Sequence, residues 1–329
     1  MIRLNPYSNY PLPLYSHLAA TYARFLFSGK CLSYPRVIQL QTQSRCNGRC
    51  LICPYPATSK TSEHGFMERE LLSKVSRELT ARKRSPMFMF ALHNEPLLDK
   101  RIFDWLKHIK SGNSRCYSIL PTNGELLDAF SLTEIEASGV DQININLGAR
   151  TRETYERIYA GLDYERVVKN VNRLLADEAM KRRVQIMFTL NKYNAHEAGR
   201  ALNYWKQLGV RVKVIVLNNR AGCLDGYDSL SPKNDPHARP PLLRGWKMIM
   251  SGARKTVGCE LPFYQMNILF NGDVIICSCD WKRATVIGNI NNSSLREIWN
   301  CDRTNEIRRL ILRKKYDRIG SCAGCSQAQ

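Results

Sequence analysis

Six runs of β-forming residues alternate with helical patterns between residues 37 and 217, and this alternation limits the possible folds more than any other feature. The predicted strands cover residues 37–42, 87–92, 116–120, 142–147, 184–190 and 212–217. The segments between them carry apolar residues at helical spacing. Repeated β-then-α units imply parallel strands with right-handed crossovers. The sequence therefore predicts an α/β fold built as a partial (β/α)6 barrel.

The pattern changes after residue 217, where about forty residues rich in Asn, Gly, Asp and Pro carry no regular period. Strand signals return at 266–270 and 274–276, separated by Asn271-Gly272, a strong hairpin signal. A capping box opens a helix at Ser294. We expect an N-terminal extension at 1–36, the barrel at 37–217, a linker or lid at 218–254 and a small β-hairpin and helix domain at 255–329.

The net charge and the number of cysteines limit the partners and the kind of site that this chain can have. Forty-nine basic and 29 acidic residues leave a net charge of +20, which suits acidic partners or serves solubility alone. No apolar run is long enough for a membrane span, and the first residues do not read as an export signal. We therefore expect a cytoplasmic protein without membrane contact. Its 12 cysteines are then better explained by metal binding or catalysis than by disulfides.

Three cysteines follow the first predicted strand with the spacing CxxxCxxC: Cys46, Cys50 and Cys53. Three thiolates can hold three corners of a cubane iron-sulfur cluster and leave the fourth iron open to a small chelating molecule. The alternative is a structural zinc, which needs four ligands, and His64 is the only local candidate for the fourth.

This loop and the β/α units after it resemble the radical S-adenosylmethionine (radical SAM) superfamily over most of the chain. The resemblance implies a [4Fe-4S] cluster that binds SAM at its open iron and cleaves it reductively. The resulting 5′-deoxyadenosyl radical then removes a hydrogen atom from a substrate. The family's Gly-Gly-Glu-Pro motif corresponds here to residues 93–96, His-Asn-Glu-Pro, which keep Glu95 for the methionine amino group but lack both glycines.

By the same resemblance, polar residues at later strand ends would contact the ribose and carboxylate of SAM. Each of them could instead cap a helix. The candidates are Asn123, Asn144, Asn146, Thr189 and Asn191.

A second cysteine set lies in the small domain. Cys259 is followed by Gly272 and Cys277, and a CxxC at Cys322 and Cys325 completes four ligands. This pattern resembles the SPASM/twitch extension of radical SAM enzymes. It implies the shorter twitch form with one auxiliary [4Fe-4S] cluster. A structural zinc on the same thiolates is the alternative, and Cys279 is a possible substitute ligand.

Cys223 follows the sixth strand, where a thiol would border the barrel mouth. In radical SAM epimerases a free thiol returns a hydrogen atom to the substrate, and Cys223 is the candidate for that role. Simple packing is the alternative.

The resemblance implies an oxidoreductase of the dehydrogenase or epimerase type. We expect a small polar substrate such as a sugar, aminocyclitol or nucleoside, and the net charge would suit an anionic one. An acidic flavodoxin or ferredoxin would supply electrons. The alternatives are maturation or epimerisation of a ribosomal peptide, RNA modification and a non-catalytic iron-sulfur scaffold. Nucleic acid is disfavoured because no RNA-binding motif is present.

Overall fold

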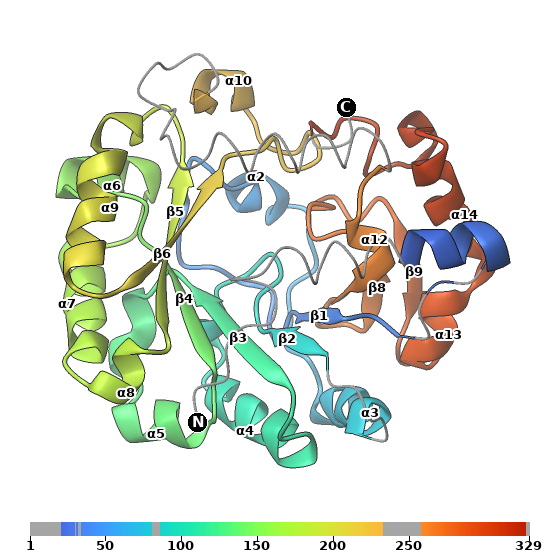
Figure 1. Cartoon of the computed structure of the whole chain (residues 1–329), viewed down its shortest axis with the longest axis horizontal. Helices are drawn as coiled ribbons and strands as arrows, with labels where there is room; N and C mark the ends of the chain where they lie inside the picture. The colour runs from blue at the N-terminus through green and yellow to red at the C-terminus, as the bar shows by residue number, and fades with distance from the viewer. Residues whose placement is uncertain (1–20, 30, 32–33, 81–85, 233–257, 327–329) are drawn as a thin grey trace.

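The computed structural model describes residues 21–29, 31, 34–80, 86–232 and 258–326. Nine strands in this part of the chain form one open sheet in the order β6-β5-β4-β3-β2-β1-β7-β8-β9 (Figure 1). The strands are β1 Val37–Leu40, β2 Met87–Met89, β3 Tyr117–Thr122, β4 Gln142–Asn146, β5 Val184–Leu190, β6 Arg211–Val216, β7 Gln265–Ile268, β8 Asp273–Ile275 and β9 Val286–Asn289.

Strands β1 to β6 pair in parallel, which confirms the predicted α/β fold with a partial barrel. Helices cover the outer face of this half of the sheet (Figure 1). They are α3 Arg69–Thr80, α4 Ile102–Gly112, α5 Leu132–Ala137, α6 Arg152–Ile158, α7 Tyr164–Leu175, α8 Glu178–Lys181 and α9 Ala198–Gln207. Shorter turns of helix join them at α2 Tyr55–Thr58, η1 Pro96–Leu98, η2 Glu125–Ala129 and η3 Ala195–Glu197.

Strand β4 shows why the sheet has two different faces. Ile143 and Ile145 are fully buried in the core between sheet and helices. Gln142, Asn144 and Asn146 alternate with these isoleucines and face the interior of the barrel, because successive side chains of a strand point to opposite faces. The interior of the barrel is therefore lined by amide side chains on this strand.

The hairpin of the small region continues the barrel sheet. β7 pairs in parallel with β1, and β8 returns antiparallel to β7, which confirms the predicted hairpin. Gly272 occupies its turn with a φ of +90°, a value that favours glycine. The predicted boundaries between barrel, linker and small domain stay a prediction.

Short helices complete the second region and the connection before it. They are α10 Tyr227–Leu230, α12 Leu261–Tyr264, α13 Leu295–Asn300, α14 Asp302–Leu312 and η7 Tyr316–Arg318. The predicted capping box at Ser294 is present and opens α13. Of the predicted linker at 218–254, residues 233–254 lie outside the described part.

The N-terminal segment packs on this second region. Residues 21–28 are helical, and the aromatic rings of Tyr22 and Phe25 lie 4.5 and 5.6 Å from the ring of Phe263 in α12. Residues 1–20 are outside the described part, as are those of the predicted extension at 30 and 32–33. No helix among the described residues has the length and apolar character to cross a bilayer.

We predict that Ser294→Ala lowers the free energy of unfolding by about 1 kcal/mol, because the first turn of α13 loses its side-chain cap. Ser294 Oγ accepts a bond from Glu297 N, and the Glu297 carboxylate accepts one from Ser294 N. Chemical denaturation should show the change. The matched control is Ser293→Ala, since Ser293 bonds Asn289 and Lys74 through its backbone. Equal stability of the two variants would contradict the prediction.

Candidate functional site

The loop that leaves β1 brings Cys46, Cys50 and Cys53 together in partly buried positions. Burial raises the pKa of Cys46 to about 12, with a further contribution from the Glu95 carboxylate. Burial also raises the pKa of Cys50 and of Cys53, and the Cys50 thiol is within electrostatic range of both other thiols. Three thiols in one low-dielectric place are unfavourable as bare thiolates, and binding to iron offsets this cost.

This donor set fits a cluster better than a single ion. Among the described residues, no three His, Cys, Asp or Glu side chains are close enough to share one metal ion. A cubane cluster does not require that closeness, because each corner takes one thiolate on a separate iron.

Gln43 fastens the cysteine loop to the loop after β2. Its Nε2 donates to the carbonyl oxygens of Arg45 and Glu95, and its Oε1 accepts from Arg45 N. Glu95 N donates to Arg45 O at 2.9 Å. These bonds fix the backbone before Cys46 beside the backbone of Glu95. The sequence analysis missed Gln43, because its partners are carbonyl groups that no sequence pattern reveals.

The Glu95 carboxylate is buried, with 3% of the residue exposed. It accepts bonds from Leu97 N at 3.1 Å, Thr122 Oγ1 at 2.6 Å and Asn123 N at 2.7 Å. Burial nevertheless raises the pKa of Glu95 to about 7. Its negative charge contributes to the raised pKa of Cys46, so the carboxylate lies near the cysteine loop.

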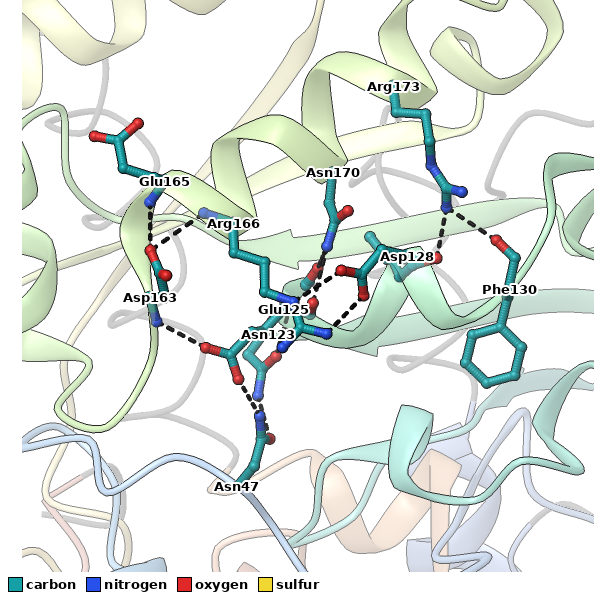
Figure 2. Close-up of polar contacts among 12 residues, drawn as sticks. Asn47, Asn123, Glu125, Asp128, Phe130, Asp163, Glu165, Arg166, Asn170 and Arg173 are labelled. Atoms are coloured by element: carbon teal, nitrogen blue, oxygen red, sulfur yellow. Dashed lines mark hydrogen bonds and ion pairs between the residues drawn. The ribbon is translucent and has the colours of Figure 1, made fainter.

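A chain of amide and carboxylate groups holds the cysteine loop from its other side (Figure 2). Asn123 Nδ2 donates to Asn47 Oδ1 at 2.8 Å, and Asn47 Nδ2 donates to Glu125 Oε2 at 2.6 Å. The other oxygen of Glu125 accepts from Asp163 N at 2.7 Å, where α7 begins. Asn123, a predicted SAM contact, thus bonds the protein's own loop. The sequence analysis missed Asn47 and Glu125, although Asn47 lies inside the cysteine motif.

The structure distributes the other predicted SAM contacts over two environments. Strand alternation places Asn144, Asn146 and Thr189 on the interior face of β4 and β5. Asn146 Nδ2 donates to Thr122 O at 3.2 Å, near the end of β3. Asn191 is fully buried in the following turn, where its side chain bonds Thr189 O and Tyr193 N. Their roles toward SAM stay predictions.

The second cysteine set also converges. The Cys277 thiol is within electrostatic range of Cys259 and Cys279, and the Cys322 thiol is within range of Cys325 and Cys279. Burial raises the pKa of Cys322 to about 11. Cys279 N donates to Cys277 Sγ at 3.3 Å, so this extra cysteine supports a predicted ligand through its backbone.

Cys223 lies beyond β6, half-buried against the loop that follows Cys279. Burial raises the pKa of the Cys223 thiol, although the positive charge of Lys282 and the backbone of Trp281 oppose the rise. The thiol is therefore neutral at ordinary pH, and only the neutral form carries a hydrogen atom to donate. Its role stays a prediction.

His93 takes the place of the expected glycine and joins the two regions. Its φ of +59° lies in the left-handed region that glycine favours. The ring stacks on Trp281 at 4.0 Å, and Nε2 contacts Ser278 O at 2.8 Å. Burial lowers the pKa of His93 to about 4, so the ring is neutral and Nε2 donates this bond.

Comparison with known proteins gives the family. The sequence model of the radical SAM superfamily matches residues 40–216, more than half of the chain. The chain belongs to the radical SAM superfamily. The model of the SPASM domain, an iron-sulfur cluster-binding domain, matches residues 259–326. The predicted cofactors are thus confirmed in kind: a [4Fe-4S] cluster with SAM, and auxiliary iron-sulfur binding.

Individual relatives are distant. The S-adenosyl-L-methionine-dependent 2-deoxy-scyllo-inosamine dehydrogenase of Niallia circulans is 22% identical over 88% of this chain and 92% of its own length. The crystal structure of BtrN with AdoMet and 2-DOIA has a TM-score of 0.60 at 18% identity, covering 88% of this chain and 92% of that one. SuiB of Streptococcus suis bound to precursor peptide SuiA reaches 0.63 at 14% identity, covering 99% and 77%. At these identities the structures show a shared fold.

We predict that Gln43→Ala weakens iron binding at the cysteine loop, because two carbonyl groups lose their common donor and the loop loses its fixed path. Iron and sulfide analysis after anaerobic reconstitution measures the effect. Gln39→Ala is the matched control, since Gln39 lies on β1 itself and donates to Met89 Sδ instead. Full iron retention by Gln43→Ala would show that the loop does not need this clamp.

Proposed function

We propose that this chain is a radical SAM dehydrogenase that oxidises a small polar natural-product intermediate such as an aminocyclitol, sugar or nucleoside. The observation that carries the proposal is the likeness to the aminocyclitol dehydrogenase, which covers 88% of this chain. A relative of 22% identity supports the reaction type but leaves the substrate open.

In this proposal Cys46, Cys50 and Cys53 hold the catalytic cluster and leave one iron for SAM. When bound, the cluster and SAM supply one-electron cleavage and a radical that abstracts hydrogen. Gln43 and Asn47 keep the cysteine loop in place, and Glu95 presents a buried acceptor beside it. The protein thus contributes position and exclusion of water.

The second set, Cys259, Cys277, Cys322 and Cys325, would hold one auxiliary cluster. Oxidation of an alcohol to a ketone removes one hydrogen atom, one proton and one electron. An auxiliary cluster can accept that electron. Dehydrogenation therefore gives the second cysteine set a function as electron acceptor. Epimerisation through Cys223 would need no such acceptor.

Polar groups in the barrel interior support a hydroxyl-rich or amino-rich substrate. Gln142 Nε2 donates to Asn144 Oδ1 at 2.6 Å and to Gln185 Oε1 at 2.8 Å, so amides line adjacent strands. On β6, Val212 packs into an apolar cluster, which leaves Arg211 and Lys213 on the interior face. Two basic residues there would also suit an anionic substrate.

Two alternatives have specific support. The likeness to SuiB, crystallised with its precursor peptide, favours a peptide substrate. The net charge of +20 would suit RNA, for which no binding motif is present, and such binding would weaken steeply with salt. The same charge would suit an acidic flavodoxin or ferredoxin as electron donor.

We predict that anaerobic incubation with dithionite, SAM and 2-deoxy-scyllo-inosamine or related aminocyclitols yields 5′-deoxyadenosine and a product lighter by two hydrogens. Mass spectrometry measures both. Cys223→Ala should still form this product, because oxidation needs no returned hydrogen. A product of unchanged mass in ordinary water that gains one deuterium in heavy water would indicate epimerisation instead. Absence of 5′-deoxyadenosine with every substrate tested would favour a non-catalytic scaffold.

We predict that reconstituted wild-type protein holds about eight iron atoms per chain and that the triple alanine variant of Cys46, Cys50 and Cys53 holds about four. The triple variant should also fail to cleave SAM. Cys116→Ala is the control, because this buried cysteine belongs to neither set. A wild-type value near four would reject the auxiliary cluster, and zinc in place of iron would reject both assignments.

A further inference from the structure

The loop after β6 has an unusual backbone. Arg220, Ala221 and Gly222 all have positive φ values, of 50°, 57° and 79°. Two of these residues are not glycine, and left-handed backbone at such positions is unfavourable unless surrounding contacts hold it. Strained backbone of this kind collects at functional sites, which directs attention to what this loop presents.

The contacts that hold the loop come from the second cysteine region. Asn219 Nδ2 donates to Gly324 O at 2.7 Å, and Ser326 N donates to Asn219 Oδ1 at 2.9 Å. Asn219 N also donates to Ser326 Oγ at 3.3 Å. A Cβ atom at Gly222 would lie 3.2 Å from Gly324 O, so the two backbones are in close contact. Figure 1 shows the chain after β6 reaching the C-terminal segment.

The side chain that this loop presents to the other region is Arg220. Its guanidinium lies within electrostatic range of two groups of the catalytic site, the Cys53 thiol and the His93 ring. Its positive charge opposes the rise that burial causes in the pKa of Cys53, and it adds to the lowering that burial causes in the pKa of His93. Its Nε atom is buried and has no hydrogen-bond partner among the described residues. In that same part of the chain no carboxylate forms an ion pair with Arg220. A buried donor without an acceptor is unfavourable, so an anionic acceptor is expected beside Cys53.

We propose that Arg220 is a positioning residue that places a positive charge beside the SAM-binding cluster and raises its reduction potential. Asn219 fixes this charge by bonding to the loop of Cys322 and Cys325. The inference rests on the proposed cluster at Cys46, Cys50 and Cys53. Reduction adds one electron from an external donor and one negative charge to that site, and no bond forms or breaks. A nearby cation stabilises the added charge, and iron-sulfur potentials respond to net charge and to hydrogen bonds at sulfur.

The test is an anaerobic redox titration of the fully loaded protein, followed by electron paramagnetic resonance in the absence of SAM and substrate. The SAM-binding cluster is recognised by the change in its spectrum when SAM is added, and the auxiliary cluster serves as reference in the same sample. Arg220→Gln should lower the midpoint potential of the SAM-binding cluster at unchanged iron content. Arg220→Lys, which keeps the charge, should stay closer to wild type.

Arg283→Gln is the matched control. Arg283 also has a positive φ of 52°, and its charge also lowers the pKa of His93. Of the two arginines, however, only Arg220 affects the pKa of Cys53. Asn219→Ala should shift the potential in the same direction as Arg220→Gln, because the charge is no longer held.

An unchanged potential in Arg220→Gln would overturn the proposal. If a second titration with SAM present then showed a shift, Arg220 would bind the SAM carboxylate instead. Because no substrate enters this titration, failure to find a dehydrogenation product would bear on the proposed function and leave this inference intact.

Discussion

The structure depends on a loop that holds three cysteines in partly buried positions, where the thiolate form of each is unfavourable. Burial raises the pKa of all three thiols, and repulsion from neighbouring thiolates adds to the rise for Cys46 and Cys50. Hydrogen bonds hold the cysteine loop from both sides. Gln43 ties its start to Glu95, and Asn47 ties its middle to Asn123 and Glu125. These hydrogen bonds hold the loop in position, and binding to iron offsets the cost of forming the thiolates.

Sequence patterns predicted the strands well because the barrel strands carry their period locally. The interval 184–190 was predicted with the bounds that the structure has, and the Asn271-Gly272 turn and Ser294 cap were also confirmed. Each of these signals lies within a few residues of the feature it predicts. Local chemistry was therefore sufficient for the elements and for the cysteine motifs.

The missed features depend on residues far apart in the chain. Asn47 and Glu125 are 78 residues apart, and Asn219 and Ser326 are 107 apart. A single sequence contains no sign that two such side chains meet. The pairing of β7 with β1 was missed for the same reason, since strand order follows from the packing of whole elements. His93 is a related case: the loss of glycine was visible, but the stack on Trp281 that accompanies its left-handed backbone was not.

The pairing of β7 with β1 connects the region of the first cysteine set to the region of the second within one sheet. β1 lies between β2 and β7, so the loop that leaves its end is positioned from both sides. Gln41, just past β1, donates to Leu92 O after β2 and accepts from Phe270 N after β7. Gly65, on the return from the cysteine loop, has no room for a side chain because the Phe270 ring lies 2.4 Å from where its Cβ would be. The hairpin of the second region thus packs against the segment that returns from the cysteine loop. The two regions therefore share contacts made by the Gln41 side chain and the Phe270 ring.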